Sequence, residues 1–146
     1  MTLHIGKDTF LLLEIVFLQK GRNMAGVKFI EHVGKKILSI DFAHAELEEI
    51  VAVIKEAKFL ISKEPLKSVL TITNVQGIRI GFGTVRVLKD LAVSNKPFVK
   101  AGAVIGLNSL QKIELDVIMK FSGRKFPSFS SFAEAADWLI NHNSNQ

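Results

Sequence analysis

Residues 68–95 constrain the fold of this chain more than any other stretch. They begin with an alternation of β-branched residues, continue through Gly77, Gly81 and Gly83, and end with apolar residues at helical spacing. This order predicts a buried strand that passes through a loop into a helix. Open α/β sheets bind ligands at such corners, so we expect the functional surface here.

The remaining sequence predicts a complete α/β domain around this unit. The expected elements, in chain order, are strands at 27–33 and 36–43 joined at Gly34 and Lys35, a helix at 46–63, a strand at 68–75, a helix at 82–94, a strand at 98–105, a helix at 109–121, a short edge strand at 126–129 and a last helix from Ser131. An initial hairpin followed by βαβ units requires a mixed sheet. We therefore expect one α/β domain with a mixed sheet of four to five strands and about four helices.

Side-chain periodicity assigns faces to several of these elements. In the second strand, one face carries Leu38, Ile40 and Phe42, and the other carries Ile37, Ser39 and Asp41. The helices carry apolar stripes made of Leu47, Ile50, Val51, Ile54, Ala57 and Ile61 in the first, Val85, Leu88, Leu91 and Ala92 in the second, and Leu110, Ile113, Val117 and Phe121 on one side of the third. The last helix begins with Ser131 and Glu134, a capping-box spacing.

The segment at residues 10–18, FLLLEIVFL, precedes this domain. It is too short to span a bilayer, Glu14 interrupts it, and no signal-peptide cleavage site follows, so we do not expect a transmembrane protein. Three readings remain open: an added edge strand, a short packing helix, or a leader upstream of Met24. We divide the chain into residues 1–23, a leader or extra element, and residues 24–146, the domain.

The formal charge of +5 comes entirely from the second part of the chain. Residues 1–66 carry nine basic and nine acidic side chains, whereas residues 67–146 carry ten and five. Such a surface suits an acidic protein, an anionic ligand or anionic lipid, but it is also within the range of ordinary soluble domains. The chain has no tyrosine and its phenylalanines are typical of core positions, so stacking on nucleic acid is not expected.

Composition and spacing also argue against several kinds of chemistry. The chain has no cysteine, which excludes disulfides, thiolate metal sites and cysteine nucleophiles, and a cytoplasmic protein is the simplest expectation. The four histidines show no metal-ligand spacing. No Ser-His-Asp set or carboxylate pair can be argued from spacing. We expect no enzyme activity, no metal and no cofactor.

Polar residues near the ends of the predicted strands form the first candidate site. Asp41, Asn74 and Asn108 each fall near the carboxyl end of a strand, and parallel strands would gather them at one rim. A ligand site there is one reading. Asp and Asn are also common turn and cap residues, which is the other.

The glycine loop and the helix after it form the second candidate site. Gly77 and its neighbouring glycines could expose backbone amides to an anion, although the spacing matches neither known phosphate-binding fingerprint and turn formation is the alternative. Thr84 could accept a phosphate beside Arg79 and Arg86, or could be a cap or first-turn residue. Lys89 belongs to the same basic stretch.

Several short motifs, taken in order, carry a resemblance to a known family. They are GKKILSIDF at 34–42, SVLT at 68–71, NKPFVKA at 95–101, AVIGL at 103–107 and the stretch from 129 to EAADWL at 134–139. In this order the chain resembles the STAS domain and its SpoIIAA-like relatives, the anti-sigma-factor-antagonist fold, over residues 27–140. It is most similar to small bacterial SpoIIAA-like proteins of unassigned function, some grouped with CRAL-TRIO-type lipid-binding domains.

The resemblance implies a regulatory role with one departure. The best-known members switch by phosphorylation of a serine in an Asp-Ser-Ser/Thr-Gly type motif at this corner. The corresponding residues 74–84 contain no serine and no aspartate, so we expect no such switch. The resemblance implies a non-enzymatic regulatory or protein-interaction module, which binds another protein or a second copy through the glycine-loop corner and the second helix. The alternative is a protein that binds a small lipid or nucleotide.

Overall fold

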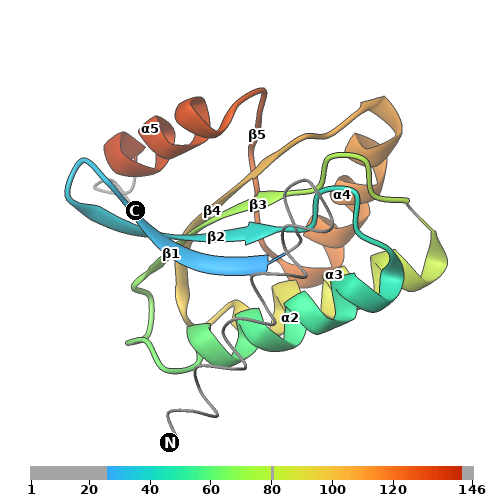
Figure 1. The fold of residues 1–146 in the computed structure, drawn as a ribbon, viewed down its shortest axis with the longest axis horizontal. Helices are drawn as coiled ribbons and strands as arrows, with labels where there is room; N and C mark the ends of the chain where they lie inside the picture. The colour runs from blue at the N-terminus through green and yellow to red at the C-terminus, as the bar shows by residue number, and fades with distance from the viewer. Residues whose placement is uncertain (1–25, 80, 143–146) are drawn as a thin grey trace, which may run out of the picture.

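The computed structural model describes residues 26–79 and 81–142, and the segment 1–23 lies outside this range. The elements are β1 (Gly26–His32), β2 (Lys35–Asp41), α2 (Leu47–Ile61), β3 (Val69–Asn74), α3 (Phe82–Asn95), β4 (Val99–Ile105), α4 (Ser109–Ser122), β5 (Ser128–Phe129) and α5 (Phe132–His142) (Figure 1). The five strands form one sheet in the order β1-β2-β3-β4-β5. β1 pairs antiparallel with β2, and the other pairs are parallel. The predicted α/β class and mixed sheet are confirmed.

The turn of the β1–β2 hairpin differs by one residue from the prediction. Val33 and Gly34 form the turn, with φ values of 49° and 76°, and Lys35 already pairs with His32. Two consecutive residues with positive φ are typical of a type I′ turn, whose twist matches that of the flanking strands.

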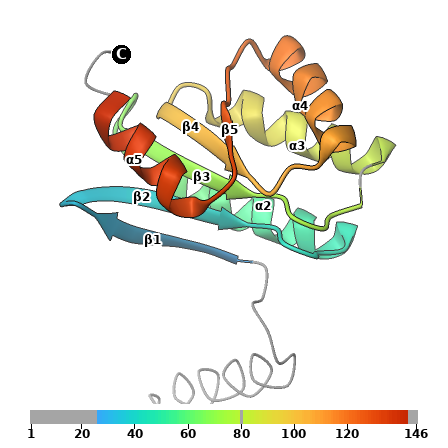
Figure 2. The same ribbon diagram turned by 90° about the horizontal axis from the view of Figure 1, so that it is seen from above.

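The sheet is covered on both faces, and β2 contributes to both cores. Helices α2, α3 and α4 lie on one side, and α5 lies on the other (Figures 1 and 2). Leu38, Ile40 and Phe42 join the larger core beneath α2 and α3, whereas Ile37 packs in the smaller core with α5. The two faces predicted for this strand are therefore confirmed.

The apolar stripe predicted for α4 lies on one side, but that side faces outward. Leu110, Ile113, Val117 and Phe121 are 62%, 61%, 38% and 69% exposed. The buried residues of α4 are Gln111, Ile118 and Ser122. The rotation follows from the start of the helix, because a capping box between Asn108 and Gln111 seats Gln111 in the interior and turns its neighbour Leu110 outward.

The start of α5 uses the predicted serine and glutamate in a modified way. Ser131 Oγ accepts a hydrogen bond from the Glu134 backbone N–H at 3.2 Å, as a capping box requires. The Glu134 carboxylate instead accepts from the backbone N–H of Ser130 at 3.2 Å and from its hydroxyl at 2.6 Å. These bonds, led by the one from the hydroxyl, lower the pKa of Glu134.

Candidate functional site

The carboxyl ends of the central strands bring the predicted rim residues together. In the parallel register Asp41 of β2 lies opposite Asn74 of β3, which lies opposite Ile105 of β4. Asn108 is the N-cap of α4, three residues after Ile105. The geometric part of the rim prediction therefore holds.

Each of these side chains is engaged by the backbone next to it. Asp41 Oδ1 accepts from the Ala43 N–H at 2.9 Å, and Asn74 Oδ1 accepts from the Gln76 N–H at 3.0 Å. Asn108 Oδ1 accepts from the Gln111 N–H at 2.8 Å. The arrangement matches the capping reading, in which short polar side chains end strands and begin helices.

The loops at this rim are joined by backbone hydrogen bonds and packed closely. His44 N–H donates to the Gln76 carbonyl at 2.8 Å. Gly77 has φ of +70°, and a Cβ at that position would overlap the His44 imidazole. Gly106 has φ of +84°, and a Cβ there would lie 2.7 Å from Asn74 Oδ1. At both positions the backbone is left-handed and lies against a neighbouring loop, which requires glycine. This agrees with turn formation rather than anion binding as the role of Gly77.

Thr84 is a buried first-turn residue of α3. Its side chain is among the buried polar groups at 6% exposure, and Oγ1 donates to the Arg79 carbonyl at 3.0 Å. The N-cap of the helix is Gly81. A kinase would reach the hydroxyl only after this hydrogen bond had opened.

The basic residues of α3 lie on the outside of the molecule. Arg86 is exposed, and Lys89 Nζ lies 4.8 Å from the ring centroid of Phe121 on α4. This cation–π contact connects the predicted basic stretch with the exposed stripe of α4.

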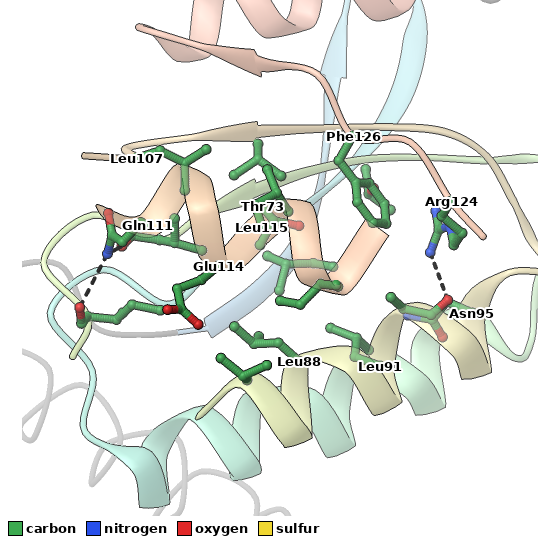
Figure 3. Close-up of a pocket in the computed structure, with 18 of the residues that line it drawn as sticks. Thr73, Leu88, Leu91, Asn95, Leu107, Gln111, Glu114, Leu115, Arg124 and Phe126 are labelled. Atoms are coloured by element: carbon green, nitrogen blue, oxygen red, sulfur yellow. Dashed lines mark hydrogen bonds between the residues drawn. The ribbon is translucent and has the colours of Figure 1, made fainter. Parts of the chain in front are cut away.

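A cavity of about 80 Å³ lies between the sheet, α3 and α4. Its wall is mainly apolar, with Leu88, Leu91, Leu115 and Phe126 among the lining side chains (Figure 3). Six polar residues also line it: Thr71, Thr73, Asn95, Gln111, Glu114 and Arg124.

None of these polar residues was singled out as a site residue from the sequence, and Gln111 and Arg124 make the most informative contacts. Gln111 Nε2 donates to the carbonyls of Val75 at 3.1 Å and Ile78 at 3.2 Å, which ties α4 to the glycine loop. The Asn108-x-x-Gln111 capping spacing was a usable signal for it. Arg124 has no comparable local signal, because only tertiary packing places it at the cavity.

Arg124 is a cation in a largely apolar setting. Its Nη1 donates to the Ala92 carbonyl at 3.2 Å, and its Cζ lies 4.4 Å from the Phe126 ring centroid. Burial lowers the pKa of Arg124 to about 10, because desolvation disfavours the charged form. No carboxylate of the described residues forms an ion pair with it.

Residues 26–79 and 81–142 contain no group of three or more His, Asp or Glu side chains placed to hold a metal ion. None of the helices in those ranges combines the length and apolar character needed to cross a bilayer.

Comparison with known proteins identifies the fold. No protein-family model and no curated protein matches the chain. Among solved structures, an uncharacterised DUF3478-family protein with a SpoIIAA-like fold from Shewanella loihica has a TM-score of 0.57 and 18% identity, covering 81% of this chain and 97% of its own. An anti-sigma-factor antagonist (STAS) domain protein from Planctomyces limnophilus has a TM-score of 0.57 and 12% identity, covering 80% and 99%.

A third structure agrees with these two. An anti-sigma factor antagonist from Mycobacterium paratuberculosis has a TM-score of 0.51 and 13% identity, and the match covers 80% of this chain and 95% of that protein. At such low identities the likeness concerns the fold. Together with the five-stranded mixed sheet, these matches confirm the resemblance seen in the sequence: this chain has the SpoIIAA-like, or STAS, fold.

Proposed function

We propose that this chain is a non-enzymatic regulatory module that binds another protein through the outer surface of α3 and α4. We call this surface the α3–α4 face and define it by Arg86, Lys89, Leu110, Ile113, Val117 and Phe121. The sequence analysis expected a partner at the glycine-loop corner and the second helix. The proposed face retains that helix, α3, and replaces the corner with α4. The row of four exposed apolar side chains on α4 motivates this choice, and the neighbouring corner adds one exposed apolar residue, Phe82, at 89%.

The exposed stripe of α4 is the observation that carries the proposal. Its four apolar side chains are 38–69% exposed and follow one another at helical spacing. Single exposed apolar residues are common on protein surfaces, but a contiguous apolar patch bordered by charge is typical of an interaction site.

The charges around the stripe indicate the chemistry of the partner. Arg86 and Lys89 lie three residues apart on α3, and Lys120 lies seven residues after Ile113 on α4, so each pair shares a helix side. We infer a partner with apolar side chains flanked by acidic ones, such as an amphipathic helix. Arg86, Lys89 and Lys120 outnumber the exposed Asp116 beside the stripe, so pairing with a second copy is disfavoured, because it would bring lysines and arginines against each other.

The named relatives and the glycine loop support the regulatory part of the proposal. Two of the three structural neighbours are named as an anti-sigma-factor antagonist or its domain. The absence of serine and aspartate at 74–84 and the buried Thr84 hydroxyl argue that partner binding is not controlled by the phosphorylated serine of better-known STAS proteins.

Two phenylalanines allow a matched test. Phe121 is 69% exposed under Lys89, and Phe59 on α2 is 60% exposed with Lys63 Nζ 4.5 Å from its ring centroid. A photo-crosslinking residue placed at position 113 or at position 59 in living cells should capture a heterologous protein only at position 113. Binding of that purified protein should weaken at least tenfold in Phe121→Ser and less than twofold in Phe59→Ser, since central aromatic contacts dominate interface energies.

The contrary results are equally specific. Equal capture at both positions, capture of a second copy alone, or equal loss of binding in the two serine variants would each contradict the α3–α4 face. Circular dichroism and a thermal melt of both variants serve as the folding control.

A further inference from the structure

We propose that the cavity between the sheet, α3 and α4 binds a short aliphatic monocarboxylate, with the Arg124 guanidinium as its counter-ion. This assigns a chemical class to the small-ligand alternative raised by the sequence. It does not depend on the α3–α4 face, which lies on the outer side of the same helices.

The hydrogen-bonding capacity of Arg124 is the first support. A guanidinium has five N–H donors in a planar fork that fits a carboxylate with two parallel bonds. One donor is used by the Ala92 carbonyl near the end of α3, and one face of the guanidinium is covered by Phe126. No other hydrogen bond from the guanidinium to a described residue is present.

The structural role of Arg124 explains part of this arrangement but not all of it. The carbonyls in the last turn of a helix lack helical partners, and a cation there complements the helix dipole. A lysine or a bound water would serve that role without placing a desolvated guanidinium at an apolar cavity. Desolvation lowers the pKa of Arg124, and no neighbouring charge offsets this effect.

Asn95 is the second support. It is 5% exposed and lies one helical turn after Ala92, at the same end of the cavity as Arg124 (Figure 3). Its carboxamide makes no hydrogen bond to any described residue. No completely buried side-chain nitrogen or oxygen of the described residues lacks a partner, so the Asn95 carboxamide reaches accessible space and can add a hydrogen bond to a carboxylate held by Arg124.

The size and the far end of the cavity define the rest of the ligand. At about 80 Å³ it is roughly half the 150 Å³ of an engineered cavity that holds benzene, which suits a tail of a few carbons. Glu114 lies toward the opposite end from Arg124 (Figure 3). Its carboxylate would repel a second negative charge, so the site favours monocarboxylates over dicarboxylates.

The experiment uses butyrate, 1-butanol and succinate as probes, with chemical-shift changes of the ¹⁵N-labelled full chain as the readout. Butyrate should shift amides of α3, α4 and residues 123–126 saturably, and succinate and 1-butanol should bind at least tenfold more weakly. From acetate to butyrate the affinity should rise about fourfold per methylene.

Variants separate charge from space. Arg124→Gln should weaken butyrate binding at least tenfold because two charge-assisted hydrogen bonds are lost, and Arg124→Lys should give a smaller loss. Leu88→Phe should weaken binding by filling the cavity while keeping the charge. Lys120 is an exposed cation on α4, and Lys120→Gln should leave the affinity unchanged.

Three results would overturn the proposal: equal affinity for butyrate and 1-butanol, unchanged butyrate binding in Arg124→Gln, or shifts that map outside the cavity. The spectra also report whether each variant is folded. Because no protein partner is present in this titration, its failure is distinguishable from failure of the α3–α4 face.

Discussion

Helices α2 and α4 cover the same face of the sheet but are attached to it in opposite ways. α2 buries a continuous apolar stripe, and its five most buried residues are at most 5% exposed: Ile50, Val53, Ile54, Ala57 and Ile61. α4 buries one large apolar side chain, Ile118, together with the polar Gln111 and Ser122.

α4 is instead attached through polar groups near its two ends. Gln111 holds its first turn to the glycine loop, and Arg124, two residues after the helix, holds the chain to the end of α3. Between these attachments lies the cavity. A helix fixed at its ends can leave space beneath its middle and apolar side chains on its outside, whereas a helix fixed along its length cannot.

The sharpest test of this contrast compares two isoleucines of nearly equal burial, Ile54 at 5% on α2 and Ile118 at 6% on α4. We expect Ile54→Ala to cost about 4 kcal/mol and Ile118→Ala about 2 kcal/mol, because a side chain beside a cavity has fewer dispersion contacts to lose. Urea denaturation measures both. Equal costs would mean that α4 is packed as tightly as α2.

The second test removes the attachment at the start of α4. Gln111→Met keeps the volume but leaves the carbonyls of Val75 and Ile78 without their side-chain donor, which should cost about 2–3 kcal/mol in urea denaturation. Gln76→Met is the control, because Gln76 is exposed and uses its backbone N–H in the loop. A loss of unfolding free energy in Gln111→Met no larger than that in Gln76→Met would show that the apolar contacts of α4 are enough to hold the helix.

The third test should change stability in the opposite direction. The folded-state pKa of Arg124 is lowered from its ordinary value to about 10 by burial, so at neutral pH the charge costs folding free energy, and this cost is relieved only as pH rises through about 10. Arg124→Met should therefore stabilise the protein by about 1 kcal/mol and raise Tm by about 4 °C. Lys120→Met should leave Tm unchanged. Destabilisation by Arg124→Met would make the Ala92 hydrogen bond the dominant role of this residue.

The smallest effect concerns the opposite face of the sheet. The Ser130 hydrogen bonds hold the pKa of Glu134 below its ordinary value of 4.5, so their stabilisation is present above that pH and is lost as pH falls through the folded-state pKa. Ser130→Ala should flatten the dependence of unfolding free energy on pH below 4.5. Ser62→Ala, whose hydroxyl donates to a carbonyl, should keep the original slope.

The sequence predicted the layers of this molecule better than it predicted α4. In β2, alternate residues point to opposite faces of the sheet. Alternation along the sequence was therefore enough to assign each residue to one of the two cores. In α4, two sets of helical positions carry apolar residues, and the larger set, with Leu110 and Phe121, was the one that periodicity favoured. Which set faces inward depends on Gln111 and the loop it binds, a contact between residues 33 and 36 positions apart.

The candidate site was predictable to a similar degree. The register of parallel strands placed Asp41 and Asn74 at one rim, as expected from their positions. Residue type alone allowed both a ligand site and local capping hydrogen bonds for these side chains, and only the structure distinguishes the two. Arg124 could not be found, since its contacts come from Ala92 on α3 and Phe126 in the segment after α4, and nothing in its own neighbourhood in the sequence marks it as partly buried.

The hollow beneath α4 also makes the molecule unevenly compressible. Close-packed interiors resist pressure, whereas an internal void disappears when water enters it. The volume of the system therefore decreases when the structure around a void opens locally. Hydrostatic pressure should therefore hydrate the layer under α4 before it disturbs the seam between α2 and β2. The amides whose chemical shifts change first as pressure rises should then be those around the cavity.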